Sequence, residues 1–261
     1  MSPKYRKVSV YPKDGGAPQV TQYGYDTICS NLKTCNKPNW SKDAKGNQTD
    51  YTYDGTHGGI TTITLPPNAN GVRSQMRYEY KQLYPRDINN NLTDTPVWRL
   101  TKTSTCRSST NACSGTADET VTEYAYNDRN LMQTSVTIHA GDNSVSATTS
   151  YGYDFVGNRV WVDGPRTDVD DKSYAVYDSN RHLLYEIGVD PDGSAPLKRV
   201  VIHHIYDGDW NETQTETGTG STITFDSNGF PTGVSDFAIT SFKRMTYDDL
   251  GRLTKTELVQ P

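Results

Sequence analysis

The sequence is poor in the side chains that fill an ordinary protein core. Only 33% of its 261 residues are hydrophobic, and Leu, Ile, Val and Phe together number 45. So small an aliphatic share is typical of disordered chains, which also lack aromatic residues and carry a high net charge. This chain instead has 18 Tyr, 4 Trp and a net charge of −5. The composition therefore predicts a folded protein with little interior.

Other absences exclude further classes of protein. Ala, the best helix former, occurs 11 times, which argues against a helical bundle. No apolar run reaches the length of a membrane span. A sequence pI near 5.5 without a basic block argues against a nucleic-acid partner. No apolar segment follows the N-terminal residues 1–7, so no signal peptide is expected, and an exported protein would need a signal outside this chain or another route.

The abundant residue types favour β-structure. Thr occurs 34 times and Tyr 18 times, and both suit a half-buried pleated surface. We therefore expect an all-β protein.

The four cysteines form two local pairs. Cys29 and Cys35 enclose one short polar segment, and Cys106 and Cys113 enclose another. Two disulfides fit this spacing and would indicate an oxidising compartment. Free thiols and a four-thiolate metal site are the alternatives, although a metal site would favour closer pairs.

A tyrosine repeat runs through the chain. Its second Tyr recurs at intervals of 24 to 29 residues, apart from two gaps of 46 and 41 residues. Five copies have a Tyr pair and three weaker copies have a single Tyr. The signature residues are Tyr23, Tyr25 and Asp26; Tyr51, Tyr53 and Asp54; Tyr78 and Tyr80; Tyr124 and Tyr126; Tyr151, Tyr153, Asp154 and Gly157; Tyr177 and Asp178; Tyr206 and Asp207; and Tyr247, Asp248 and Gly251.

Each copy predicts one β-hairpin. Two Tyr at i and i+2 share a face of a strand, and the following Asp can end that strand by accepting a backbone hydrogen bond in an Asx-turn. A Gly such as Gly157 then supplies the positive φ of a hairpin turn. A single hairpin cannot bury its apolar face alone, so neighbouring hairpins must pair in sequence.

These motifs resemble the YD repeats of Rhs (rearrangement hotspot) proteins, of bacterial insecticidal toxin complexes and of teneurins. The best copies are YGYDFVGNRV at 151–160 and TYDDLGRLTKTEL at 246–258, and the cysteine segment at 29–40 is also similar. The resemblance covers residues 20–258. It implies a curved ribbon of sequential antiparallel β-hairpins that forms an open segment of a hollow shell.

The resemblance also implies what lies around the ribbon. In the family the shell encloses a polypeptide, often a C-terminal toxin. This chain is too short to close such a shell and lacks the Asp-Pro autocleavage motif and a toxin domain, so we expect a fragment of a longer protein. The Asp-Pro at 190–191 is interpreted as a turn. We expect a lead-in at 1–19 with a first strand pair, the ribbon at 20–258 with insertions near 84–120 and 208–240, and a tail at 259–261.

The sequence offers little support for chemistry. His203 and His204 are adjacent on a strand and would face opposite sides. The acidic runs at 168–171 and 190–192 match no calcium-loop spacing, and no nucleotide-binding or nucleophile-elbow motif occurs. We predict no catalytic, cofactor or metal site, and no enzyme activity.

The predicted function is a structural section of an Rhs-type shell, secreted or on the surface of a bacterium. Its partners would be other parts of the larger protein or the enclosed polypeptide, with some self-association through sheet edges. The alternatives are a carbohydrate- or receptor-binding surface module, because exposed aromatic rings can stack on sugars, and an enzyme.

Overall fold

The computed structural model describes residues 5–11, 13, 15–106, 108, 113–193 and 196–260. The described residues form nineteen β-strands and no α-helix, so none of them offers a helical segment that could cross a membrane. The prediction of an all-β chain of sequential antiparallel hairpins is confirmed. The chain divides into two compact units, residues 1–147 and 148–261.

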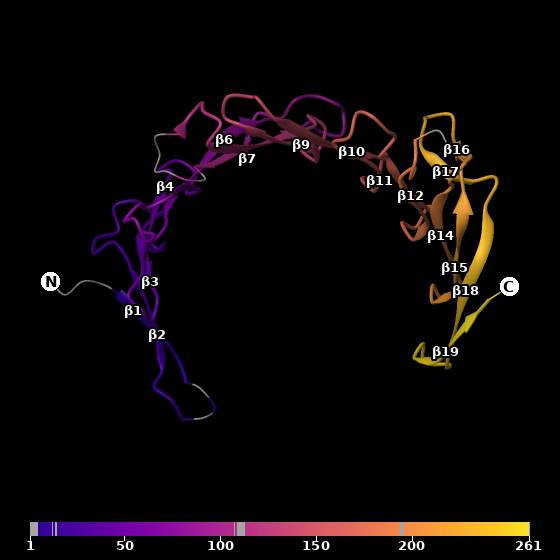
Figure 1. Ribbon diagram of the computed structural model, residues 1–261, viewed down its shortest axis with the longest axis horizontal. Helices are drawn as coiled ribbons and strands as arrows, with labels where there is room; N and C mark the ends of the chain where they lie inside the picture. Colours follow the sequence, from indigo (N-terminus) through magenta and orange to yellow (C-terminus); the bar gives the residue numbers. More distant parts are fainter. Residues whose placement is uncertain are drawn as a thin grey trace. The chain divides into compact units, whose positions relative to one another are not determined.

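The first unit is a ladder in which each strand pairs antiparallel with the next in the sequence (Figure 1). Its strands are β1 (Tyr5–Val10), β2 (Gln19–Gly24), β3 (Trp40–Lys42), β4 (Gln48–Tyr53), β5 (Ile60–Thr64), β6 (Gln75–Leu83), β7 (Val97–Cys106), β8 (Glu119–Tyr126) and β9 (Gln133–Ala140). In the segment 84–120, an isolated bridge joins Arg86 and Leu92 ahead of β7.

The second unit repeats this plan with one interruption. Its strands are β10 (Ser146–Tyr153), β11 (Arg159–Asp163), β12 (Ser173–Tyr177), β13 (Leu183–Ile187), β14 (Arg199–Tyr206), β15 (Glu212–Gly220), β16 (Ile223–Phe225), β17 (Pro231–Val234), β18 (Ala238–Tyr247) and β19 (Leu253–Val259). β15 pairs with β18, and β16 and β17 form a separate two-stranded hairpin between them. The segment 208–240 therefore contains an inserted hairpin.

The main core of the second unit lies under this inserted hairpin. Val176, Ile187 and Val201 on β12, β13 and β14 are at most 5% exposed. Ile223 of β16 and Val234 of β17 pack against them. One face of this part of the sheet thereby gains a second layer.

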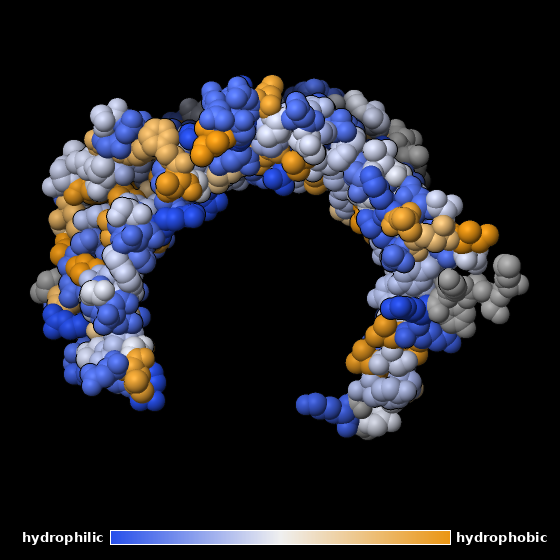
Figure 2. All heavy atoms as spheres, turned by 180° about the vertical axis from the view of Figure 1, so that it is seen from behind, coloured by the Kyte–Doolittle hydropathy of each residue, from blue (hydrophilic) through white to orange (hydrophobic). Residues whose placement is uncertain are grey.

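The first unit buries a smaller and more polar cluster. Val121 on β8 is 2% exposed, and Ser104 and Glu119 are buried near it. On the face seen in Figure 2, hydrophobic residues are scattered in small groups among hydrophilic ones. The described strands therefore bury few hydrophobic side chains, in agreement with the small aliphatic share of the sequence.

Candidate functional site

The repeated feature of the structure is a corner where each Tyr-Asp strand turns into the next strand. In seven copies the pairing register shifts directly before the Tyr that precedes the turn residue, which is the geometry of a β-bulge. These residues are Tyr53, Tyr80, Tyr126, Tyr153, Tyr177, Tyr206 and Tyr247. In six copies this Tyr is the last residue of its strand, so the twist that the bulge accentuates leads directly into the turn, whereas β6 continues past Tyr80 to Leu83.

The Asp carboxylate holds the turn closed. Oδ1 of Asp207 accepts hydrogen bonds from the backbone N–H groups of Asp209 and Asn211, each at 2.9 Å, and Oδ2 accepts one from Asn211 Nδ2 at 3.0 Å. Oδ1 of three other repeat aspartates accepts the same two backbone N–H groups: Asp154, Asp178 and Asp248. One carboxylate thus satisfies two backbone donors that the ladder leaves unpaired.

The third residue after each of these aspartates has a positive φ. Gly157 and Gly251 hold this position in two turns, with φ of 90° and 72°. Arg181 and Trp210 hold it in the other two, with φ of 73° and 66°. The conformation is nearly free for glycine but strained for other residues.

Among the turns of the same kind that escaped the sequence analysis are two with an Asp and a Gly three residues later. Asp43 and Asp226 each accept the N–H groups two and four residues ahead, and Gly46 and Gly229 have positive φ. Neither aspartate follows a Tyr. The pattern D-x-x-G, present at both places, could have identified them.

At four corners the Tyr before the turn ties its hairpin to the preceding one. The hydroxyl of Tyr206 donates to the carbonyl oxygen of Leu183 at 2.9 Å, across β13 and β14. Tyr247 donates in the same way to Glu212 at 3.0 Å. Tyr126 donates to Leu100 at 2.8 Å and Tyr53 to Pro38 at 2.9 Å. We call this contact the tyrosine staple; it makes the Tyr-Asp corner a joint between hairpins as well as a turn.

The ionisation states suit this structural role. Burial raises the pKa of the stapling Tyr206, so its hydroxyl keeps its proton and donates. The hydrogen bonds from Asn211 lower the pKa of Asp207. Those from Arg252 lower the pKa of Asp248. Asp207 and Asp248 are therefore charged acceptors, and the hydrogen bonds of their own turns engage them.

The glycine in two Tyr-Gly-Tyr-Asp copies lies under a tryptophan of the adjacent strand. Gly24 pairs with Trp40 and Gly152 with Trp161. A Cβ atom added at Gly152 would lie 1.9 Å from Trp161 Nε1, and one at Gly24 would lie 2.0 Å from Trp40 Nε1. The indole ring thus covers the glycine backbone, a contact that the sequence analysis missed.

Both cysteine pairs are disulfides in the structure. The S–S distances are 2.06 Å for Cys29–Cys35 and 2.01 Å for Cys106–Cys113. Asp118 lies near the second pair, but sulfurs bonded to each other are not thiolate ligands.

The Cys106–Cys113 disulfide adjoins a buried ion pair. Arg77 of β6 contacts Glu119 of β8 at 2.8 Å, and the Glu119 side chain is 6% exposed. Glu119 also accepts a hydrogen bond from the backbone N–H of Gly115. Burial raises the pKa of Glu119, but hydrogen bonds from Gly115 and Ser104 and the charge of Arg77 give a net lowering. The charged Glu119 thereby anchors the segment after the disulfide to the sheet.

His203 and His204 have separate surroundings. The ring of His203 stacks on Tyr185, with centroids 4.2 Å apart, and its Nδ1 lies 2.9 Å from Glu216. His204 Nδ1 lies 2.6 Å from Glu212, and its Nε2 lies 3.1 Å from Glu186. The structure does not bring the two rings to one site.

The acidic segments also have local partners. Asp168 pairs with Arg166 at 3.0 Å, and Asp170 pairs with Arg199. Asp190 accepts the N–H groups of Asp192 and Gly193, as expected of a turn.

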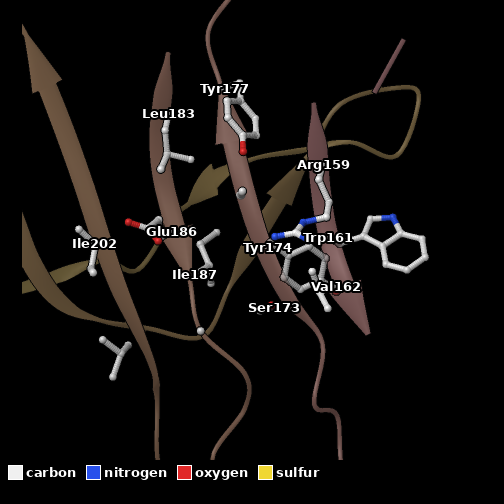
Figure 3. Close-up of a pocket in the computed structure, with 13 residues that line it drawn as sticks. Arg159, Trp161, Val162, Ser173, Tyr174, Tyr177, Leu183, Glu186, Ile187 and Ile202 are labelled. Atoms are coloured by element: carbon white, nitrogen blue, oxygen red, sulfur yellow. The ribbon is translucent and has the colours of Figure 1, made fainter. Parts of the chain in front are cut away.

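A shallow groove crosses β11 to β14 of the second unit. It has a volume of about 370 Å³ and is lined by residues that include Arg159, Trp161, Tyr174, Tyr177 and Glu186. Figure 3 shows these side chains rising from neighbouring strands. Aromatic rings beside a cation and a carboxylate are chemistry that can hold a sugar.

These observations define a class of protein, a β-hairpin repeat with stapled Tyr-Asp corners. No family model matches the sequence. No curated protein matches it either.

Solved structures share the fold. The crystal structure of TcdB2-TccC3-Cdc42 has a TM-score of 0.52 and 13% identity, and the match covers 94% of this chain and 12% of that chain. The crystal structure of TcdB2-TccC3-TEV has a TM-score of 0.51 and 12% identity, covering 92% of this chain and 14% of that chain. The chain thus spans about an eighth of the length of the chains it resembles.

Proposed function

We propose that this chain is a non-enzymatic structural section of an Rhs-type YD-repeat shell that encloses or presents a polypeptide such as a toxin. The observation that carries the proposal is the tyrosine staple, because at four corners it links a hairpin to the one before, and such a link can be repeated along a longer ribbon. The fold shared with TcdB2-TccC3 chains supports it.

The use of polar groups supports the non-enzymatic part of the proposal. The repeat aspartates with a lowered pKa, such as Asp207 and Asp248, accept turn hydrogen bonds. An enzyme would need acid, base or nucleophile groups that converge on one reacting atom. Here the repeat aspartates instead recur from hairpin to hairpin, each in its own turn.

The small share of each matched chain that this chain covers bears on its partners. Because the chain matches 12% and 14% of the structures it resembles, we propose that further repeat segments of a larger protein adjoin it. Two disulfides suit an oxidising environment, and we propose that the protein acts outside the cytoplasm, secreted or on a bacterial surface.

Limited proteolysis of the natural protein that contains this segment tests the proposal. An enclosed polypeptide should co-purify with the segment and resist protease until urea opens the repeats. A Tyr206→Phe/Tyr247→Phe variant should release protection at lower urea than a Tyr84→Phe control. Equal digestion of the co-purifying polypeptide with and without urea would contradict enclosure.

The groove on β11 to β14 favours a second candidate, a carbohydrate-binding module. A glycan array distinguishes the two functions. Binding that is lost in Tyr174→Ala and retained in Tyr84→Ala would support the module, because Tyr174 lines the groove whereas Tyr84 is an exposed residue after β6. The shell proposal expects no such binding.

A further inference from the structure

One cluster in the first unit combines two sulfur atoms with a carboxylate. The Sγ atoms of Cys106 and Cys113 and a carboxylate oxygen of Asp118 all lie within 4.8 Å of one another. Within the residues that the structure describes, no other group of His, Cys, Asp or Glu side chains gathers in this way. Thiolates and carboxylates are both ligands of Zn²⁺ in proteins. The cluster therefore has the ligand types of a zinc site, although its sulfurs are bonded to each other in the oxidised protein.

Reduction would free both sulfurs with little movement of the backbone. The Cα atoms of Cys106 and Cys113 are 5.7 Å apart. A tetrahedral zinc site with Zn–S distances of about 2.3 Å places its two sulfurs about 3.8 Å apart. Rotation about the two Cα–Cβ bonds provides that separation. Cys106 ends β7, and Asp118 directly precedes β8, so two paired strands hold these ligands in place.

The surroundings of the sulfurs favour a bound cation over two free thiols. Cys106 and Cys113 are 4% and 3% exposed. The guanidinium of Arg77, which also pairs with Glu119, donates to Cys113 Sγ at 3.8 Å. A cation beside a thiol favours its thiolate form. Buried thiolates in turn need opposite charge close by, and a divalent ion supplies it.

Hydrogen bonds orient the carboxylate of this cluster. Asp118 Oδ1 accepts the backbone N–H of Ser108 at 3.0 Å and the Ser108 hydroxyl at 2.7 Å. Donors of this kind fix the position of a ligating carboxylate and raise metal affinity. Asp118 is half-buried, so water can reach the fourth coordination position that three protein ligands leave open.

We propose that the reduced protein binds one Zn²⁺ ion through Cys106, Cys113 and Asp118, and that formation of the disulfide displaces the ion. Each thiol releases its proton to solvent when it binds the metal. A disulfide oxidant then accepts two electrons from the two thiolates and takes up two protons as it becomes two thiols. The protein sulfurs join, and Zn²⁺ leaves. Either crosslink anchors the segment 113–119 to the sheet, whether or not the protein encloses a polypeptide.

The other cysteine pair provides an internal control. The Cα atoms of Cys29 and Cys35 are 5.0 Å apart, so their spacing is similar. In the part of the chain that the structure describes, no His, Asp or Glu side chain completes a metal-binding group with them. Two thiolates without a third protein ligand hold Zn²⁺ more weakly, because the metal prefers three or four protein ligands.

Zinc binding by the full chain tests the proposal. The protein is reduced with a water-soluble phosphine, which is itself oxidised to the phosphine oxide, and is then mixed with Zn²⁺ and gel-filtered. Atomic emission should find about one ion per chain in reduced Cys29→Ser/Cys35→Ser protein. Reduced Cys106→Ser/Cys113→Ser protein should retain about tenfold less. Equal zinc in the two variants, or no more zinc after reduction than before it, would overturn the proposal.

A second measurement isolates the carboxylate and the thiolates. Asp118→Asn should weaken the affinity of the reduced protein for Zn²⁺ by about tenfold or more, measured against a chromophoric chelator, whereas Asp94→Asn should not. Co²⁺ in place of Zn²⁺ should give the visible absorption of tetrahedral thiolate coordination in reduced wild-type protein, and oxidised glutathione should abolish it. Bound Co²⁺ without that absorption, or an Asp118→Asn variant with unchanged affinity, would contradict the assigned ligands.

Discussion

At the scale of single residues, the tyrosine hydroxyl and the glycine between paired tyrosines form the contacts that join neighbouring strands. The stapling hydroxyl reaches a carbonyl on the preceding hairpin, as Tyr206 does on Leu183. The glycine between paired tyrosines leaves room for an indole ring, as Gly152 does for Trp161. Both contacts connect strands that a bare ladder would join by backbone hydrogen bonds alone.

Removing one staple should weaken the fold measurably. Tyr206→Phe keeps the ring but loses the hydrogen bond to Leu183, and we expect the free energy of unfolding to fall by about 1 kcal/mol. Urea denaturation followed by circular dichroism measures it. Tyr84→Phe is the control, and an equal loss in that variant would contradict the staple.

Filling the space above a repeat glycine should cost more. In Gly152→Ala the new methyl group would overlap the Trp161 ring, and we expect a loss of about 1–3 kcal/mol as the ring is displaced. Tryptophan fluorescence during urea unfolding would report both the displacement of the Trp161 ring and the loss of stability. Gly208→Ala is the matched control, because a Cβ atom there meets no atom within 4 Å.

At the scale of elements, charged turns decide where strands end and where the inserted hairpin is held. Asp236 closes the base of the β16–β17 hairpin by accepting the backbone N–H groups of Ser221 and Thr222 at 2.9 and 2.8 Å. Lys198 contacts the same carboxylate at 3.0 Å. The backbone N–H of Thr222 is the largest cause that holds the pKa of Asp236 well below its usual range.

This depressed pKa predicts a dependence of stability on pH. Because the folded pKa lies below the unfolded value, the ionised carboxylate stabilises the fold at neutral pH, and its contribution declines as the pH falls below about 4 towards the folded pKa. The difference in unfolding free energy between wild type and Asp236→Ala should therefore be largest near pH 6 and shrink by pH 2. Urea titrations at both pH values measure it, with Asp94→Ala, a substitution at an exposed residue between β6 and β7, as control. A constant difference would contradict the assignment.

At the scale of the whole molecule, stability depends on few buried groups. The largest fully buried side chains are Ile187, Val121 and Val201. The Arg77–Glu119 pair and two disulfides supplement them in the first unit. Such a chain has little hydrophobic free energy in reserve.

The disulfides should consequently contribute to global stability. Cys106→Ser/Cys113→Ser should lower the free energy of unfolding by about 2 kcal/mol, the usual effect of opening so short a loop. The mass of the intact wild-type protein should be about 4 Da lower before reduction than after it, because two disulfides lack four hydrogens. Equal masses would show that the thiols are free.

The tyrosine repeat allowed the fold class and many of the turns to be predicted from the sequence. A Tyr-Asp step followed by Gly predicts a strand end and a hairpin turn from local chemistry, and Asp154 and Asp248 close such turns. Arg181 and Trp210 carry no such signal, because neither residue favours positive φ.

The sequence by itself determined that the protein is built from sequential β-hairpins, because alternation, Asx-turns and glycine turns act between residues close in the chain. The tertiary structure decided which carbonyl each tyrosine reaches, which glycine a tryptophan covers and where the β16–β17 hairpin packs. Such contacts can join residues far apart in the sequence; Tyr206 and Leu183, for example, are 23 positions apart. They depend on the register between strands, which the bulges and turns set only once the hairpins have paired.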